Sequence, residues 1–410
     1  MRRVVVTGLG AVSPCGLDAP STWTGMVQGR SGIGPITRFD TTGWSCTVAG
    51  EVKGFDGAQR VGRRDVRRMD LFMQYAVAAG EEAVADSGLD PATWDRQRVG
   101  VYVGTGIGGL IELASGFGGY AERGPKGLSP FFIPRSLANL AGGWLAMRLG
   151  CEGPHLAMAT ACASGTHSIG EAWRLIRSGE ADVVLAGGAE APVLPEGVAG
   201  FMVMKALTKR ADPPEEACVP FDARRDGFVI GEGAGVLVLE DYEHAKARGA
   251  RIYAELVGYG NNCDAHHLTA PSPGGIGASR CMDMALRSGG LQPEQVDYVN
   301  AHGTSTPAND KAETQAIRTS FGQHADKLMV SSTKSVTGHL LGAAGGVEAL
   351  ATVMAVYEQT VPPTATWRER DPDCDLDYVP REARQATVRA ALCNSFGFGG
   401  VNACLAFTRV

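Results

Sequence analysis

The residue with the clearest chemical setting is Cys162, which lies in the run Ala159-Thr-Ala-Cys-Ala-Ser-Gly165. Small side chains on both sides allow a sharp turn at the start of a helix that we predict over Gly165–Ser178. At a helix N-terminus the dipole and the free backbone N–H groups favour thiolate, the reactive form of cysteine. The same N–H groups can hold the oxygen of a tetrahedral acyl intermediate. The sequence therefore predicts that Cys162 is an acyl-carrying nucleophile.

Two of the eight histidines, His302 and His339, lie in glycine-containing segments that follow predicted strands. His302 is in Asn300-Ala-His-Gly-Thr-Ser-Thr, and His339 ends the run Ser332-Thr-Lys-Ser-Val-Thr-Gly-His. An imidazole at such a strand end is exposed and positioned, unlike one on an apolar helix face, so we predict that both are catalytic. The other histidines are interpreted as structural, with a reservation for His267. They are His155, His167, His244, His266, His267 and His324.

Composition excludes several classes of protein. A net charge of −6 gives no support to nucleic-acid binding, and no apolar run reaches the roughly 18–20 residues of a membrane span. Ten cysteines without a secretion signal suggest reduced thiols in a cytoplasm. No C-x-x-C pair is present, so we expect neither zinc nor an iron–sulfur cluster. Five cysteines are expected to be buried and structural: Cys15, Cys46, Cys218, Cys281 and Cys404.

Short β-branched runs alternate with helical patterns along the whole chain, which indicates a layered α/β protein. Strands are predicted over Arg3–Thr7, Val99–Val103, Val183–Ala186, Gly235–Leu239, Val296–Asn300, Met329–Ser332 and Ala403–Phe407. Helices are predicted over Arg64–Asp86, Gly165–Ser178 and Gly345–Glu358.

The chain also contains an internal repeat. The segment that begins Phe228-Val-Ile-Gly-Glu-Gly resembles the segment that begins Phe396-Gly-Phe-Gly-Gly-Val, 168 residues later. Upstream of each lies a strand followed by a small-residue turn and a helix, one turn with Cys162 and the other with His339. We therefore predict two related α/β halves, 1–250 and 251–410, packed as one unit.

Taken together, four motifs resemble those of the elongating β-ketoacyl-acyl-carrier-protein synthases of type II fatty-acid synthesis. The motifs are Thr160-Ala-Cys-Ala-Ser-Gly, Asn300-Ala-His-Gly-Thr-Ser-Thr, Ser332-Thr-Lys-Ser-Val-Thr-Gly-His and Asn394-Ser-Phe-Gly-Phe-Gly-Gly-Val-Asn. The similarity extends from Arg3 to Phe407. It implies a thiolase-like α/β fold, which is a duplicated five-layered αβαβα arrangement, and a dimer formed through the first half.

The resemblance also implies roles for individual residues. The family's nucleophile falls on Cys162 and its two catalytic histidines on His302 and His339. Its lysine falls on Lys334. Two supporting positions complete the set: a glutamate, Glu348, and a gating phenylalanine, Phe398, whose backbone N–H would form an oxyanion hole with that of the nucleophile.

The reaction that this resemblance implies is a decarboxylative Claisen condensation. Malonyl-acyl-carrier-protein and an acyl thioester on Cys162 would give a β-ketoacyl-acyl-carrier-protein. Two neutral imidazoles can stabilise the intermediate enolate by donating hydrogen bonds. No metal or organic cofactor is expected, because the departing carboxylate supplies the driving force. The matches to substrate-binding positions are Ile107, which would have to move for longer acyl chains to enter, Phe132, Gly197, Phe201, Thr304 and Thr306.

The expected partner, an acyl carrier protein, is acidic and needs a basic docking surface. Three arginines have the i, i+3, i+4 spacing of one helix face within the predicted helix Arg64–Asp86, and two lysines match further basic positions of the family. The docking positions are Arg64, Arg67, Arg68, Lys126 and Lys205. Two positions depart from the family: Val401 replaces a threonine in the gating loop, and Gly127 replaces a residue that is often basic.

Three competing interpretations are weaker. Val103-Gly104-Thr-Gly106-Ile-Gly-Gly109 matches the dinucleotide motif G-x-G-x-x-G, but the acidic strand end expected about 20 residues later is absent. A thiolase needs a second catalytic cysteine near the C-terminus, where Cys393 and Cys404 lie, whereas His339 favours the decarboxylating type. A noncatalytic chain-length subunit would lack Cys162.

One alternative stays open, a ketosynthase subunit of a type II polyketide or polyene pathway that works beside a chain-length partner. The sequence also leaves open the acyl-chain preference and the choice between a homodimer and a heterodimer.

Overall fold

The computed structural model describes all residues, 1–410, and its centre is one mixed ten-stranded sheet in the order β10-β9-β13-β14-β8-β1-β7-β6-β4-β5. The strands are β1 (Val4–Val12), β4 (Val99–Gly104), β5 (His155–Leu156), β6 (Val183–Glu190), β7 (Gly233–Asp241), β8 (Ala254–Cys263), β9 (Tyr298–Asn300), β10 (Met329–Ser331), β13 (Ala390–Gly397) and β14 (Val401–Thr408). Two small ribbons pair β2 (Gly34–Pro35) with β3 (Val48–Ala49) and β11 (Thr360–Val361) with β12 (Arg384–Gln385).

The sheet consists of two halves with the same pairing pattern, joined where β1 meets β8 through only two residue pairs. From this junction outward, one half is β1-β7-β6-β4-β5 and the other is β8-β14-β13-β9-β10. In both halves the first two pairings are antiparallel and the next two are parallel. This correspondence agrees with the internal repeat in the sequence.

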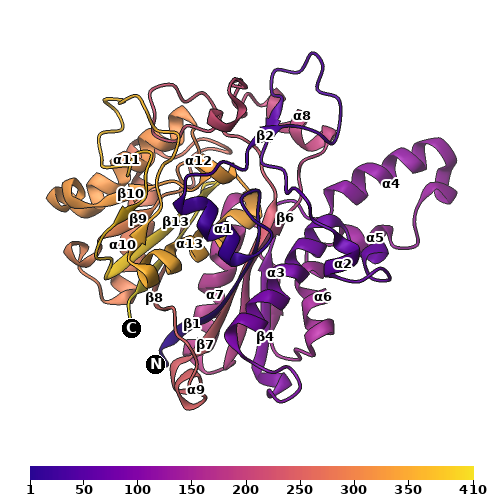
Figure 1. Ribbon diagram of the computed structural model, residues 1–410, viewed down its shortest axis with the longest axis horizontal. Helices are drawn as coiled ribbons and strands as arrows, with labels where there is room; N and C mark the ends of the chain where they lie inside the picture. Colours follow the sequence, from indigo (N-terminus) through magenta and orange to yellow (C-terminus); the bar gives the residue numbers. More distant parts are fainter.

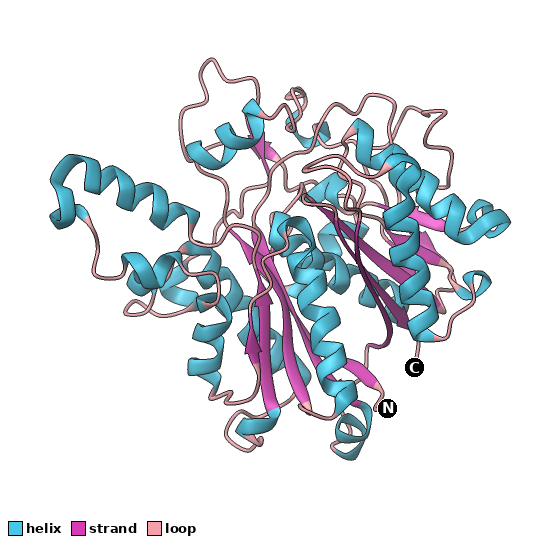
Figure 2. Ribbon diagram, turned by 180° about the vertical axis from the view of Figure 1, so that it is seen from behind, coloured by secondary structure: helices cyan, strands magenta, loops and turns pink.

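Helices form three layers around the two half-sheets (Figures 1 and 2). Helices α7 (Ser164–Ser178) and α13 (Ala344–Glu358) pack together between the half-sheets, α3 (Leu71–Ser87) and α6 (Leu140–Leu149) cover the outside of the first half, and α10 (Ile276–Gly289) and α11 (Pro307–Phe321) cover the second. The remaining helices are α1 (Ala19–Val27), α2 (Gly57–Arg60), α4 (Leu110–Arg123), α5 (Phe132–Ser136), α8 (Pro195–Val203), α9 (Tyr242–Ala247) and α12 (Lys334–Thr337).

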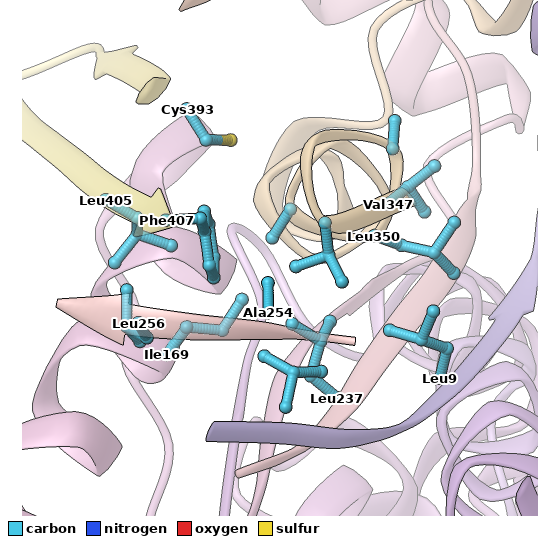
Figure 3. Packing of buried hydrophobic residues seen from close by; sticks show 14 of the residues in the cluster. Leu9, Ile169, Leu237, Ala254, Leu256, Val347, Leu350, Cys393, Leu405 and Phe407 are labelled. Carbon is cyan, nitrogen blue, oxygen red and sulfur yellow. The ribbon is translucent and has the colours of Figure 1, made fainter. Parts of the chain in front are cut away.

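The core between the half-sheets is built around α13, which is almost entirely apolar and buried. Figure 3 shows Val347 and Leu350 of this helix above Leu237 of β7. Glycine allows the helix to come this close, because a Cβ on Gly235 would lie 2.3 Å from the Val347 nitrogen. The tight packing holds the N-terminal ends of α7 and α13 together, and these ends carry or adjoin the candidate catalytic residues.

The predicted helix Arg64–Asp86 is wrong in its first seven residues. The chain forms a short 3₁₀ turn over Val66–Arg68, and α3 begins only at Leu71. Asp70 precedes the helix in an extended conformation, and its carboxylate accepts hydrogen bonds from the N–H groups of Phe72 and Glu112. The three docking arginines therefore do not share a helix face.

None of the helices combines the length and the apolar character needed to cross a lipid bilayer.

Candidate active site

Cys162 lies in a 3₁₀ turn over Ala161–Ala163 that leads directly into α7, as its small neighbours predicted. Ala161 has φ = 49°, a conformation that costs energy for a residue with a side chain. Ser164 holds this turn, because its hydroxyl donates to the Ala161 carbonyl at 2.7 Å and accepts from the Thr160 N–H at 2.9 Å. The sulfur-bearing side chain is 7% exposed. The strained turn fixes the direction in which the thiol points.

His302 lies on the loop after β9, where a buried carboxylate fixes its backbone. Glu313 of α11 accepts the N–H groups of His302 and Gly303, both at 2.8 Å. On the other side, the Lys334 ammonium donates to the His302 carbonyl at 2.6 Å and lies 3.4 Å from Nδ1. Since an ammonium can only donate, Nδ1 accepts, and the ring proton of His302 is on Nε2.

His339 follows α12 and Gly338, and its backbone joins a different part of the chain. Its N–H donates to the Val229 carbonyl at 2.7 Å, and its carbonyl accepts from the Gly231 N–H at 2.9 Å. The ring is 1% exposed, yet neither of its nitrogens has a hydrogen-bond partner. A buried imidazole without a partner is costly in a folded protein. This ring is therefore available to a ligand.

The three side chains converge on one cavity. The sulfur of Cys162 and the nearest ring nitrogens of His302 and His339 all lie within 4.8 Å of one another. The two imidazole rings meet edge to face, with their centroids 5.3 Å apart. The cavity has a volume of about 420 Å³. Nine of the expected residues line it: Cys162, His302, His339, Phe398, Ile107, Phe201, Thr304, Thr306 and Lys205.

Lys334 and Glu348 lie behind His302, where they form a buried ion pair. Burial raises the pKa of Glu348 to about 7, against the opposing effect of the Lys334 charge. The second carboxylate oxygen of Glu348 has no partner. Lys334 contacts both the carbonyl and the ring of His302, so the pair orients this imidazole.

The protonation states of the three convergent groups follow mainly from burial. Burial, together with the nearby Lys334 charge, holds the pKa values of His302 and His339 well below their usual range, so both imidazoles are neutral. Burial raises the pKa of Cys162 to about 11, although the Lys334 charge and the Phe398 N–H act in the opposite direction. The backbone N–H groups at the helix N-terminus thus favour the thiolate, as expected, but desolvation outweighs them and the thiol form predominates near neutral pH.

The loop that carries Phe398 connects β13 with β14 and is held from outside. The Gly399 N–H donates to the Leu268 carbonyl at 2.7 Å, and the Asp264 N–H donates to the Gly400 carbonyl at 2.8 Å. The Phe398 N–H points toward the Cys162 sulfur. Val401 lies on the other side of the loop and lines a separate cavity.

Two expected substrate-binding residues do not line the cavity. Phe132 of α5 packs on α4, with its ring centroid 5.9 Å from that of Phe117. Gly197 lies inside α8, where a Cβ would come 2.2 Å from the Pro192 carbonyl oxygen. Gly197 therefore fixes the helix that carries Phe201 instead of contacting a ligand in this chain.

The expected docking residues lie on the surface but do not all surround the cavity. Lys205 is exposed at its rim. Arg64 and Arg67 are exposed in the segment before α3, and the half-buried Arg68 places its guanidinium 5.6 Å from the Phe131 ring centroid.

The second docking lysine, Lys126, is exposed in the turn after α4. Its neighbour Gly127 cannot be basic in this structure, because a Cβ there would lie 1.9 Å from the Gly119 carbonyl oxygen. This contact explains the departure from the family at position 127.

The structure does not support the dinucleotide-binding and thiolase interpretations. The glycine loop after β4 cannot bind a pyrophosphate, since the N–H groups of Gly106, Ile107 and Gly108 all donate to the buried carboxylate of Glu190. The two candidates for the second catalytic cysteine of a thiolase are fully buried and lie outside the cavity: Cys393 and Cys404. Sequence reasoning missed Glu313 and Glu190, which lie in helical or strand patterns without any local sign of a polar role.

The fold and the cysteine–histidine–histidine site define a condensing acyltransferase. The chain belongs to the β-ketoacyl synthase family. Its residues 1–245 match the family model "Beta-ketoacyl synthase, N-terminal domain", and residues 253–368 match "Beta-ketoacyl synthase, C-terminal domain". It is 52% identical over 408 residues to the "3-oxoacyl-[acyl-carrier-protein] synthase 2" of Synechocystis sp., covering 100% of this chain and 98% of that protein.

Solved structures with the same fold include two ketosynthases of natural-product synthesis. The ishigamide ketosynthase/chain length factor superposes with a TM-score of 0.94 at 39% identity, covering 100% of this chain and 99% of that one. A type II polyketide ketosynthase bound to its acyl-carrier protein and a hexaketide gives 0.92 at 35% identity, with both chains fully covered. The expected thiolase-like α/β fold is confirmed.

Proposed function

We propose that the chain condenses malonyl-acyl-carrier-protein with an acyl group carried on Cys162, giving a β-ketoacyl-acyl-carrier-protein and CO₂ in fatty-acid elongation. The observation that carries this proposal is the His339 ring, whose two nitrogens lack partners beside the reactive sulfur. Relatives named 3-oxoacyl-[acyl-carrier-protein] synthase 2, about half identical over the full length, support the same reaction.

The first step loads the enzyme. The Cys162 thiol, whose pKa is about 11, ionises to a small extent, and the thiolate attacks the carbonyl carbon of an acyl thioester. The N–H groups of Cys162 and Phe398 hold the resulting oxyanion. The carbon–sulfur bond to the carrier then breaks, and the carrier thiol leaves with the proton. The acyl chain extends past Ile107 and Phe201, the hydrophobic residues that line the cavity.

The second step forms the new carbon–carbon bond. The malonyl carboxylate leaves as CO₂, and the electron pair becomes an enolate on the thioester oxygen. His302 donates to this oxygen from Nε2, and His339 donates from a ring nitrogen. The enolate carbon attacks the acyl carbonyl, and Cys162 leaves as a thiolate that takes up a proton from solvent. Each neutral imidazole carries one N–H group, which it can donate to the enolate oxygen.

Other residues would bind the carrier and its prosthetic arm. Thr304 and Thr306 line the cavity and share a hydrogen bond of 2.9 Å between their hydroxyl groups, so they are suited to the amides of a pantetheine arm. Lys205 at the rim would contact the carrier. The outer docking positions in this proposal are Arg64, Arg67, Arg68 and Lys126.

We further propose a dimer formed through the first of the two halves, 1–250 and 251–410. The α4–α5 segment projects from the first half (Figure 1), and apolar side chains are exposed on it and on the edge strand β5. Exposed fractions of 62% for Phe117, 59% for Ile133 and 50% for Leu156 are high for a monomer surface. Phe132 lies in this segment, so it would reach a site of the second copy.

Ten free cysteines without a disulfide support a reducing cytoplasm.

Intact-mass analysis with acyl-carriers of graded length and then malonyl-carrier tests the proposal. We expect an acyl adduct on Cys162, its loss on adding malonyl-carrier, and a β-ketoacyl product two carbons longer. The likeness to a ketosynthase/chain length factor favours a second candidate, a polyketide subunit. Loading without elongation by the homodimer would support that candidate. No adduct on Cys162 with any carrier would refute both.

A further inference from the structure

Glu190, the last residue of β6, is a buried carboxylate without a cationic partner. Its side chain is 1% exposed, and no arginine or lysine forms an ion pair with it. It accepts hydrogen bonds from the Thr105 hydroxyl at 2.8 Å, and from the N–H groups of Gly106 at 2.6 Å, Ile107 at 3.2 Å and Gly108 at 3.3 Å. Successive N–H groups that converge in this way hold an anion strongly.

The fifth bond of this carboxylate reaches a different segment. The Gly342 N–H, three residues after His339, donates to Glu190 at 3.0 Å. The two segments touch, since a Cβ on Gly342 would lie 2.2 Å from the Gly106 nitrogen. One carboxylate therefore joins the loop of Ile107, which lines the cavity, to the loop of His339.

We propose that Glu190 is a positioning residue that holds the Thr105–Gly108 loop against the cavity and thereby limits the length of acyl chain that Cys162 accepts. This inference rests on the proposed function. The Ile107 side chain is 40% exposed toward the cavity, and the loop has no helix or strand of its own to hold it. Because Ile107 lines the cavity, any outward movement of this loop that widens the cavity for a longer acyl chain must break bonds to Glu190. Hydrogen bonds to an ionised acceptor are stronger than neutral ones and oppose this movement.

The variant Glu190→Gln tests this role. Its amide keeps the shape but removes the charge and offers one acceptor oxygen in place of two. We expect the ratio of tetradecanoyl to hexanoyl loading rates on Cys162, measured by intact mass, to rise about tenfold, which corresponds to about 1.4 kcal/mol. Turnover with malonyl-carrier should fall several-fold, because the loop of His339 loses its bond from Gly342.

Glu240→Gln is the matched control. Glu240 is equally buried and lies at the opposite end of the β6–β7 pair, where it accepts from Thr7 and Arg248, each at 2.7 Å. It should lower the melting temperature without changing the loading ratio. Should Glu190→Gln not fold, Thr105→Val removes one donor to the same carboxylate and should raise the ratio in the same direction.

An unchanged ratio in a folded variant, or the same change in Glu240→Gln, would overturn the role of Glu190. Failure of the proposed function would look different, since the wild-type protein itself would then release no β-ketoacyl product.

Discussion

Replacing His339 by alanine should abolish condensation while leaving the loading of Cys162 almost intact. The ring donates no hydrogen bond within the protein, so the substitution leaves no internal group unpaired. The backbone bonds of residue 339 to Val229 and Gly231 remain, and the ring borders a cavity that already exists. The loss is therefore confined to one donor to the enolate. Such a donor contributes about 3–4 kcal/mol, or a factor of about 10²–10³ in rate.

The assay separates the two steps. The enzyme is first loaded with an acyl-carrier and weighed intact, and CO₂ release from malonyl-carrier is then followed. We expect His339→Ala to load at close to the wild-type rate and to release CO₂ at least 100-fold more slowly. His324→Ala, which removes a histidine bonded to the Val296 carbonyl at 2.8 Å, should leave both steps at close to the wild-type rate. Decarboxylation at the wild-type rate by His339→Ala would refute the reasoning, as would an equal loss of both steps.

Three further outcomes follow from the charges of the site. Lys334→Met should destabilise the fold by about 3–5 kcal/mol in urea titrations, because Glu348 is left buried without its cation, and the added change Glu348→Gln should recover most of this loss. Acid should also weaken the fold. Since the pKa values of His302 and His339 lie well below their unfolded value, the unfolded chain binds more protons below about pH 6.5, and stability falls by up to about 1.4 kcal/mol per pH unit for each histidine. Replacing either His302 or His339 by alanine should reduce the slope of stability against pH by the contribution of one proton. An unchanged slope would contradict the neutral state of the two imidazoles. Alkylation of Cys162 by iodoacetamide should accelerate about tenfold per pH unit from pH 7 toward its pKa of about 11, whereas a rate that levels off near pH 7 would indicate a resting thiolate.

The turns that carry the candidate catalytic residues could be predicted from the sequence because their signals are local. Small residues around Cys162 and the glycines beside His302 and His339 mark turns regardless of the rest of the fold. Besides the two-residue strands, two strands were not predicted, β8 and β13. In β8 a Cβ on Gly258 or Gly260 would lie 2.2 Å or 2.0 Å from backbone oxygens of α10. Close helix packing therefore requires glycines, which resemble a loop in the sequence.

Tertiary contacts explain the other differences. Helix α3 does not extend back to Arg64 because the carboxylate of Asp70 accepts an N–H group from α4. This donor lies 42 residues further along the chain. The link through Glu190 joins segments that are 152 residues apart, and no local pattern marks it. The position of Phe132 outside the cavity depends on packing between α4 and α5. No local sequence pattern marks this packing or a contact with a second copy.

The raised pKa of Cys162 changes how the two steps of the reaction are related. A resting thiolate would place a permanent negative charge beside the position where the enolate forms, and like charges in a buried site repel strongly. A thiol beside neutral imidazoles carries no such charge. Acylation then removes the sulfur from titration altogether, so the only anion left in the cavity is the one that His302 and His339 can stabilise. Burial slows the first step by disfavouring the thiolate, and it strengthens every hydrogen bond to the enolate in the second step. The same desolvation that raises the pKa of Cys162 thus also keeps both histidines neutral.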